Sequence, residues 1–418
     1  MKVAIVHDFL REYGGAERVV EAMHEIWPEA PVYTSFVDWK SLGRHAERFK
    51  NWDIRPSWVQ HNWLVKKFHS PLRFLAPKIW ESFDLSHFDV VISSSGWFIC
   101  RGVRTGALAG PASRVSRDSL QIDREIKSIA PSSKYSLRSE VSSQDALARV
   151  TRQKPLHICY IHHPPRNLYG YATGSDLQKY WFVRAYATVI NFFLRHYDFD
   201  TAQRVDFFVA NSQETARRVA KFYRRDSIVI YPPVDMSESR VTSHESRKEK
   251  YFLSVGRLTY AKRIDLAIQV CNKLKLPLKI VGIGKEEKFL RSLAGPTIEF
   301  VGSVSDEELD ELYEGARGFI FSALDEDFGI VPVEAMAHGV PVIGLAQGGA
   351  LETVVDGKTG LLFVEPTVES LEEAMKRFLR MKKDWSKKCI SQAKKFSKER
   401  FQKEFKTFVD EQFRNSSQ

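Results

Sequence analysis

Two glutamates, Glu326 and Glu334, flank a Phe-Gly pair within the segment FSALDEDFGIVPVEAMAHG. If a helix begins near Gly329, its free N–H groups and the positive end of its dipole form an anion site, with Glu334 about one turn inside the helix. Carboxylates also accept strong hydrogen bonds from sugar and ribose hydroxyls. The pattern therefore predicts a site for a ligand that carries both phosphate and hydroxyl groups. The alternative is that both glutamates only cap and solvate a surface helix.

A second glycine-rich turn follows the next expected strand. Gly348, Gly349 and Glu352 come after the apolar run at 341–345, and the turn sequence DGKTG follows at 356–360. Open parallel sheets bind ligands beyond the carboxyl ends of their strands. This second turn therefore favours the ligand site over the simple surface helix.

Two cations follow another expected strand, at 251–256. Arg257 comes directly after this strand, and Lys262 follows five residues later. A guanidinium fork and an ammonium group at a strand end suit a departing diphosphate, because both stabilise developing negative charge. For Lys262 taken in isolation, an ordinary solvated loop charge is an equal alternative.

Gly14-Gly15 and His162 are weaker signals in the first half of the chain. The glycine pair lets the backbone approach a ligand closely, but such pairs also occur in ordinary tight turns and do not form the GxGxxG fingerprint of dinucleotide sites. His162 lies in CYIHHPPR, between an expected strand and a rigid Pro-Pro turn. Taken alone, a single histidine is more often structural than catalytic.

The sequence contains no recognisable metal or cofactor motif. Cys, His and Asp residues do not occur at metal-ligand spacings, and P-loop, GxSxG and HExxH motifs are absent. A DxD-type pair occurs at 198–200, within an expected aromatic helix, and at 325–327, within the glutamate segment. We therefore expect neither a metal ion nor a cofactor.

The charge distribution argues against a nucleic-acid partner. The chain has 62 Lys and Arg against 52 Asp and Glu, a net charge of +10, but the excess lies in residues 104–153 and 367–418. The remaining body is formally neutral, which argues against a generally cationic nucleic-acid binder. Four cysteines without a CxxC pair indicate a reducing cytosol. We expect a cytoplasmic protein, because neither a signal-peptide core nor a spanning apolar run occurs.

Short apolar runs alternate with helical stretches along the whole chain. This alternation predicts an α/β protein whose parallel sheets are covered on both faces. The expected strands are at 2–6, 88–95, 156–163, 206–212, 227–234, 251–256, 278–282, 298–302, 318–324, 341–345 and 360–363.

The strands fall into two Rossmann-like domains, at 1–235 and 251–395. A polar stretch at 236–250 is the expected linker, and a C-terminal helix is expected at 396–418. Near the end of the chain, four phenylalanines are spaced so that they form one apolar stripe on a helix: Phe396, Phe401, Phe405 and Phe408.

Residues 104–153 interrupt the α/β pattern. This Ser-rich segment has too few apolar residues to offset the entropy of ordering it, and we predict a disordered insertion in the first domain. Such a long loop is either an embellishment or a regulatory or acceptor-contacting element.

With these residues identified, the chain resembles the retaining GT-B glycosyltransferases of family 4 over nearly its whole length. The resemblance rests on HDF and GGAERV, CYIHHPPR and NSQETARRV, SVGRL with Lys262, FVGSVSDEEL, EDFGIVPVEAMA and GGALETVVDGKTGLLF, in this order. The motif sequences EDFGIVPVEA and GGALETV are most similar to those of GDP-mannose-dependent α-mannosyltransferases of O-antigen-type glycan assembly. It implies two Rossmann-like domains that face each other across a cleft, with a C-terminal helix that crosses back to the first.

The resemblance also implies residue roles. Arg257 and Lys262 would hold the donor diphosphate, Glu334 the ribose hydroxyls and Val304 the base, while Gly256 would lie against the donor. Glu326 and the backbone of Phe328, Gly329, Ile330 and Val331 would hold the transferred sugar and its phosphate. Gly14 and Gly15 would approach donor and acceptor, and His162 would contact the sugar near the reacting carbon. His163 departs from the family pattern, which usually has Thr, and so does the 104–153 insertion.

The implied activity is metal-independent transfer of a hexose, mannose from GDP-mannose, to a hydroxyl of a glycan or polyprenyl-linked acceptor, with retention at the anomeric carbon. Two alternatives on the same fold are a sugar-nucleotide epimerase and a non-catalytic nucleotide-sugar-binding scaffold.

The segment 51–80 mixes aromatic and basic side chains, among them Trp58, Trp63, Phe68 and Trp80 with Lys66, Lys67 and Arg73. Such a segment suits a peripheral position on an anionic membrane, where it would receive a polyprenyl-linked acceptor. The alternative, which we favour on composition, is that ordinary amphipathic helices pack these aromatic side chains into the domain core.

Overall fold

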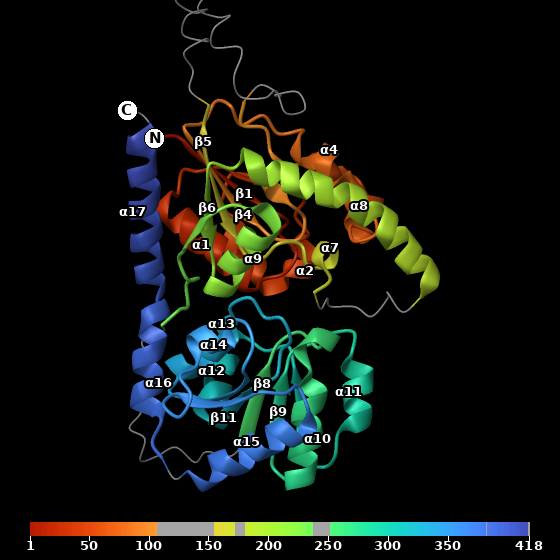
Figure 1. The fold of residues 1–418 in the computed structure, drawn as a ribbon, viewed down its shortest axis with the longest axis vertical. Helices are drawn as coiled ribbons and strands as arrows, with labels where there is room; N and C mark the ends of the chain where they lie inside the picture. The colour runs from red at the N-terminus through yellow and green to blue at the C-terminus, as the bar shows by residue number, and fades with distance from the viewer. Residues whose placement is uncertain (107–153, 172–179, 237–250, 382, 417–418) are drawn as a thin grey trace, which may run out of the picture.

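The computed structural model describes residues 1–106, 154–171, 180–236, 251–381 and 383–416. They form two α/β domains, each with a parallel sheet, and a C-terminal helix that runs from the second domain back along the first (Figure 1). This confirms the predicted α/β architecture of two Rossmann-like domains. Most of the predicted insertion (107–153) and linker (237–250) lies outside the described residues.

The first domain is built on a seven-stranded sheet in the order β3-β2-β1-β4-β5-β6-β7, in which every neighbouring pair is parallel. The five strands predicted in this half are all present, and β2 and β3, with three residues each, were missed. The strands are β1 (Val3–His7), β2 (Val32–Thr34), β3 (Ile54–Pro56), β4 (Val90–Ser95), β5 (Leu156–Ile161), β6 (Phe207–Ala210) and β7 (Ser227–Val229).

Helices cover both faces of this sheet (Figure 1). The α-helices are α1 (Gly15–Ile26), α2 (Trp39–Leu42), α3 (Trp63–Lys67), α4 (Ala76–Trp80), α7 (Arg166–Tyr169), α8 (Trp181–Arg204) and α9 (Gln213–Tyr223). Short 3-10 turns are η1 (Gly43–Phe49), η2 (Trp58–His61), η3 (Arg73–Leu75) and η4 (Cys100–Gly102).

The second domain has a six-stranded parallel sheet in the order β10-β9-β8-β11-β12-β13. Its strands are β8 (Tyr251–Val255), β9 (Leu278–Val281), β10 (Ile298–Gly302), β11 (Ala316–Phe321), β12 (Val342–Leu345) and β13 (Gly360–Phe363). Its helices are α10 (Ile264–Leu274), α11 (Glu287–Leu293), α12 (Asp306–Glu314), α13 (Ile330–Ala337), α14 (Ala350–Thr353), α15 (Val368–Arg380) and α16 (Ser386–Ala393), with 3-10 turns η7 (Tyr260–Lys262) and η8 (Lys394–Phe396).

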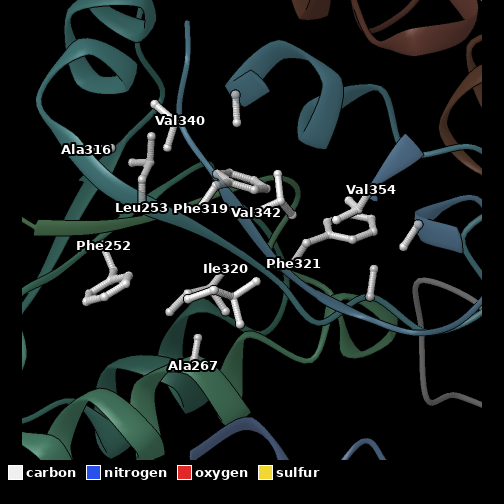
Figure 2. Packing of buried hydrophobic residues seen from close by; sticks show 14 of the residues in the cluster. Phe252, Leu253, Ala267, Ala316, Phe319, Ile320, Phe321, Val340, Val342 and Val354 are labelled. Atoms are coloured by element: carbon white, nitrogen blue, oxygen red, sulfur yellow. The ribbon is translucent and has the colours of Figure 1, made fainter. Parts of the chain in front are cut away.

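The core of the second domain lies on both faces of its sheet. On β11, Phe319 and Ile320 are both buried and point to opposite faces, as successive strand residues must. Figure 2 shows Ile320 on the side of Ala267, which belongs to α10, and Phe319 beside Val342 of β12. Burial on both faces explains why these strands are continuous apolar runs in the sequence.

The C-terminal phenylalanines join the two domains. Phe396, on η8, is buried in the core of the second domain, whereas Phe401 and Phe405 of α17 (Lys398–Ser416) are buried in the first. Phe408 is partly buried against the same first-domain core. The predicted stripe therefore exists, but it is not continuous. The backbone at Ser397 is extended and interrupts the helix, so the phenylalanines before and after it lie in different cores.

We predict that Phe405→Ala destabilises the first domain by about 3–5 kcal/mol, because truncating a buried phenylalanine removes its transfer free energy and leaves a cavity. Urea unfolding monitored by circular dichroism measures this loss. Phe289→Ala is the matched control, since Phe289 is 52% exposed on α11. Equal stabilities of the two variants would contradict the placement of α17 in this core.

Candidate active site

The predicted site residues lie on loops that follow strands of both domains and meet where the domains face each other. Gly14-Gly15 precedes α1, after β1, and the segment 322–329 follows β11 and leads into α13. A Cβ atom added to Gly15 would lie 2.7 Å from Cδ1 of Ile330, closer than real Cβ contacts. Glycine at position 15 therefore allows the two domains to touch at the start of α13.

Lys262 and Glu326 form an ion pair within the second domain. The Lys262 Nζ donates to Glu326 Oε2 at 2.7 Å, and both side chains are about four-fifths buried. Burial alone would raise the pKa of Glu326, but attraction to Lys262, Arg166 and Arg257 outweighs it and lowers the pKa to about 2. The Glu326 carboxylate is therefore ionised at neutral pH.

Arg257 lies at the open edge of this cluster. Its Nη1 donates to Glu12 Oε1 at 3.0 Å, across from the second domain to the loop that carries the glycine pair. The Arg257 side chain is 70% exposed, so this contact is weak and screened by solvent. An arriving anion can therefore take the place of Glu12 at little cost.

Glu334 lies on α13, as predicted, and is buried. Its Oε1 is 2.7 Å from Nη1 of Arg18, which comes from α1 of the opposite domain. The hydroxyl of Tyr313 donates to the other carboxylate oxygen at 3.3 Å. Attraction to Glu334 raises the pKa of Arg18 above its ordinary value. Sequence reasoning missed Arg18, although it lies inside the quoted motif GGAERV.

Asp327, which the sequence showed only as part of a DxD-type pair, is a further carboxylate at the contact between the domains. It is buried and accepts hydrogen bonds from two arginines of the first domain, Arg166 on α7 and Arg218 on α9. Burial would lower the pKa of Arg166, but attraction to Asp327 more than reverses this and raises it. Both arginines lie in quoted motifs, CYIHHPPR and NSQETARRV, but no local pattern indicates that they converge on one carboxylate.

Glu352 adds a further contact between the domains. Its two carboxylate oxygens accept hydrogen bonds from the backbone N–H groups of Gln213 and Glu214, at 2.8 and 3.0 Å. These N–H groups open α9, so the carboxylate also lies at the positive end of that helix. Asp327 and Glu352 therefore both hold α9 against the second domain.

The second glycine pair supports the glutamate segment. A Cβ at Gly348 would lie 2.1 Å from the carbonyl oxygen of Glu326, and one at Gly349 would lie 2.0 Å from that of Phe328. The Gly349 N–H donates to the Glu326 carbonyl at 2.9 Å. These glycines thus let a backbone turn pack directly beneath the segment, and any larger residue would displace Glu326.

The start of α13 has the geometry that the sequence predicted. Gly329 is the N-cap residue with φ 80°, in the left-handed region that glycine favours, and Ile330 and Val331 form the first turn. The Phe328 ring is buried beside Tyr231 and Phe396, with centroids 5.6 and 5.4 Å away. Phe328 therefore offers only its backbone to a ligand.

His162 belongs to a buried hydrogen-bonded chain in the first domain. Its Nε2 is 2.7 Å from Ser94 Oγ, which is 3.2 Å from Nδ1 of His7, whose Nε2 is 3.4 Å from Glu17 Oε1. The other Glu17 oxygen accepts from the Gly14 N–H at 2.9 Å. Burial holds the pKa of His162 well below its usual range, so the imidazole is neutral. This chain connects His162 to the glycine loop, which the sequence did not reveal.

Gly256 and Val304 complete the predicted set. A Cβ at Gly256 would lie 3.9 Å from the Lys262 side chain, so the glycine faces that cation. Val304 follows the edge strand β10, two strands away from β8, and packs partly against the domain core. Among the described residues, no group of three or more His, Cys, Asp or Glu side chains is arranged to hold a metal ion.

The arrangement resembles solved structures over almost the whole chain. Anabaena HepE in complex with UDP-glucose matches with a TM-score of 0.65 at 15% identity, covering 98% of this chain and 100% of that one. Sucrose-phosphate synthase from Thermosynechococcus elongatus matches with a TM-score of 0.64 at 15% identity, covering 99% and 100%. The fold is that of the GT-B glycosyltransferases.

The match to a protein-family model lies in the second domain of this GT-B fold. Residues 235–396 match the family model described as glycosyl transferases group 1. The putative colanic acid biosynthesis glycosyltransferase WcaL of Salmonella typhimurium is 32% identical over 34% of this chain and 39% of its own length. The mouse alpha-1,3/1,6-mannosyltransferase ALG2 is 26% identical over 57% of this chain and 63% of its own length. The chain thus spans less than two thirds of the length of these relatives.

The low pKa of Glu326 predicts how the Lys262 pair contributes to stability. A carboxylate whose folded pKa lies below its unfolded value stabilises the fold above the unfolded pKa of about 4.5, and this contribution declines as the pH falls toward the folded pKa of about 2. Lys262→Met removes the main attraction, so burial raises the pKa of Glu326. We expect the difference in melting temperature between wild type and Lys262→Met to be largest above pH 5 and to shrink as the pH falls below about 4.5.

Thermal unfolding followed by circular dichroism from pH 7 to pH 3.5 measures this difference. Lys388→Met, at an exposed lysine of α16, is the control and should show the same offset from wild type at every pH. A Lys262→Met offset that is equally independent of pH would contradict the assigned ion pair.

Proposed function

We propose that this protein is a retaining glycosyltransferase that moves mannose from GDP-mannose to a hydroxyl of a lipid-linked or polysaccharide acceptor, without a metal ion. One observation carries the proposal. Lys262, Glu326 and the start of α13 lie together at the carboxyl ends of β8 and β11, and Arg257 contributes to the same electrostatic cluster. Such a set combines cations for a diphosphate with a carboxylate for sugar hydroxyls.

In this proposal the diphosphate of the donor binds between Arg257, Lys262 and the N-terminus of α13. Backbone N–H groups and the helix dipole at the first turn favour a phosphate there. Arg257 leaves its contact with Glu12 and binds the phosphate instead. Lys262 binds the phosphate while it keeps its contact with Glu326. Glu334 accepts hydrogen bonds from the ribose hydroxyls, in exchange for part of its contact with Arg18.

The transfer step replaces one bond at the anomeric carbon by another on the same face. The bond between this carbon and the β-phosphate oxygen breaks, and the acceptor oxygen forms the new bond. The acceptor proton passes to an oxygen of the departing phosphate. Arg257 and Lys262 stabilise the charge that develops on the nucleoside diphosphate, and the protein contributes position and electrostatics.

Neutral His162 suits a contact with a sugar hydroxyl better than a role as a general acid. Its pKa lies well below neutrality, so at pH 7 the ring is not the imidazolium that could protonate a leaving group. The buried chain through Ser94, His7 and Glu17 fixes its ring. We infer that His162 orients the sugar near the reacting carbon.

Two observations support mannose as the transferred sugar. The chain is similar to relatives named as mannosyltransferases, and its EDFGIVPVEA motif resembles that of GDP-mannose-dependent enzymes. The solved HepE complex contains UDP-glucose, so a uridine donor is the alternative to test. A panel of GDP and UDP sugars, assayed by nucleotide release with and without a glycan acceptor, separates these donors. Acceptor-dependent release also distinguishes a transferase from an epimerase, which needs no acceptor, and from a scaffold, which releases nothing.

We predict that Lys262→Ala and Arg257→Ala each slow acceptor-dependent transfer by about 10²- to 10³-fold, because each removes one preorganised group that stabilises charge in the transition state. Radiolabelled sugar transfer, or acceptor-dependent nucleotide release, measures the rate. Lys388→Ala removes an exposed lysine outside the cleft and should leave the rate unchanged. Near wild-type turnover of either cleft variant would refute the roles assigned to these cations.

A further inference from the structure

Helix α8 exposes large apolar side chains along one of its faces. Phe182, Tyr186, Val189 and Phe193 are between 39 and 65% exposed and follow each other at intervals of four, three and four residues. This spacing aligns them in one stripe along the helix. Trp181 and Phe192, also exposed, lie at the border of the same stripe. A soluble surface rarely carries so many adjacent exposed aromatic side chains without a partner.

The opposite face of α8 is fixed to the first domain. Its buried residues are Ala187, Asn191, Leu194, Asp198, Thr201 and Ala202. Asp198 forms a fully buried ion pair with Arg101 of η4, and Tyr169 donates to its second oxygen at 2.7 Å. The inward face thus consists of small and polar residues with few apolar ones. Repacking therefore cannot turn the aromatic stripe inward without breaking this buried ion pair and leaving a charge unpaired.

The exposed stripe continues onto the segment 63–74. Tyr186 of α8 donates its hydroxyl to the Pro71 carbonyl, and Arg73 donates to Asn191 Oδ1 at 2.6 Å. On this neighbouring segment the exposed apolar side chains are Trp63 (68%), Leu64, Phe68 and Phe74. We call these residues and the α8 stripe together the aromatic face. Of the two interpretations of 51–80, core packing holds for Trp80, which is buried, but not for Trp63 or Phe68.

The aromatic face is cationic and free of acidic residues. No Asp or Glu occurs between residues 54 and 80, or between residues 180 and 197, whereas the first segment contains both Lys and Arg and the second contains Arg184 and Arg195. Lys67 lies on this face, 5.6 Å from the ring centroid of Phe68, with Lys66 beside it. Aromatic side chains interleaved with Lys and Arg are typical of elements that lie in the interface of a bilayer with anionic lipids.

We propose that the aromatic face docks this protein onto the surface of an anionic membrane. An isologous dimer would place this acid-free, cationic face against its own copy, where like charges repel. The anionic surface offers the complementary charge and accepts the aromatic rings at headgroup depth. No helix among the described residues has the length and apolar character required to cross a bilayer, so α8 would lie along the surface.

The aromatic face adjoins the interdomain site. Asn191 and Arg195 of α8 donate to the carbonyl groups of Asn167 and Leu168, at 2.9 and 3.3 Å. These two residues belong to α7, which begins with Arg166, the partner of Asp327. Figure 1 shows α8 along the outer side of the first domain, with its first turns extending beyond the neighbouring elements. The role of this docking rests on the proposed function: it would bring a lipid-linked acceptor near the donor site.

Co-sedimentation with vesicles of phosphatidylcholine and phosphatidylglycerol, compared with phosphatidylcholine alone, tests the docking without any activity assay. We expect binding to the anionic vesicles that weakens with salt. Two variants, Phe182→Ser/Phe193→Ser and Lys66→Glu/Lys67→Glu, should each reduce the partition coefficient at least about tenfold, because they remove apolar area or reverse charge at the interface. Melting curves confirm that each variant is folded, and the charge variant preserves the test if the Phe variant does not fold.

Matched controls lie on the second domain, away from this face. Phe289→Ser changes an exposed phenylalanine of α11, and Lys387→Glu/Lys388→Glu reverses two adjacent exposed lysines of α16. Both should bind vesicles like wild type. Unchanged binding of the two aromatic-face variants would overturn the proposal. So would a vesicle-free dimer, seen by analytical ultracentrifugation, that Phe182→Ser/Phe193→Ser dissociates. Vesicle binding by a protein that binds no nucleotide sugar would support docking and refute the proposed function.

Discussion

Carboxylates buried between two domains require cations beside them, and this constraint organises the whole site. Glu326, Asp327 and Glu334 come from one segment that follows β11, and each is partly or fully buried. Their partners are Lys262 from the same domain and Arg18, Arg166 and Arg218 from the other. An unpaired charge at such depth would cost several kcal/mol. Helices α1, α7 and α9 of the first domain must therefore place three guanidinium groups at fixed points on the second.

The glycine residues make this delivery possible. Gly15 allows the first domain to approach Ile330 at the start of α13, and Gly348 and Gly349 allow a turn to pack against the backbone of Glu326 and Phe328. The C-terminal segment holds the same arrangement from outside, because Phe396 of η8 lies in the core of the second domain and Phe401 and Phe405 of α17 lie in the core of the first. The charged contacts and the close backbone approach thus depend on each other, and together they hold the two domains in contact at the site.

The sheets were accessible from the sequence because their strands are buried on both faces and read as continuous apolar runs. β2 and β3 were missed because VYT and IRP are too short to establish a periodicity, whereas β7, which is equally short, lies within the longer run SIVIYPPV. Within the site, Lys262, Glu326 and the start of α13 belong to local motifs, so their neighbourhood could be predicted. The pairs Arg18–Glu334 and Arg166–Asp327 join residues that are more than 150 positions apart, and no local pattern encodes such a contact. The exposure of Trp63 and Phe68 likewise depends on tertiary packing, which composition does not reveal.

A crystal structure of the protein with GDP-mannose bound tests the central claim most directly, because Lys262, the start of α13 and Glu334 are each proposed to contact a particular group of the donor. We predict that the diphosphate contacts the Lys262 ammonium and the first turn of α13, and that the ribose hydroxyls lie within hydrogen-bond distance of the Glu334 carboxylate. A nucleotide bound elsewhere, with the pairs Lys262–Glu326 and Arg18–Glu334 unchanged and both carboxylates without ligand contacts, would contradict it.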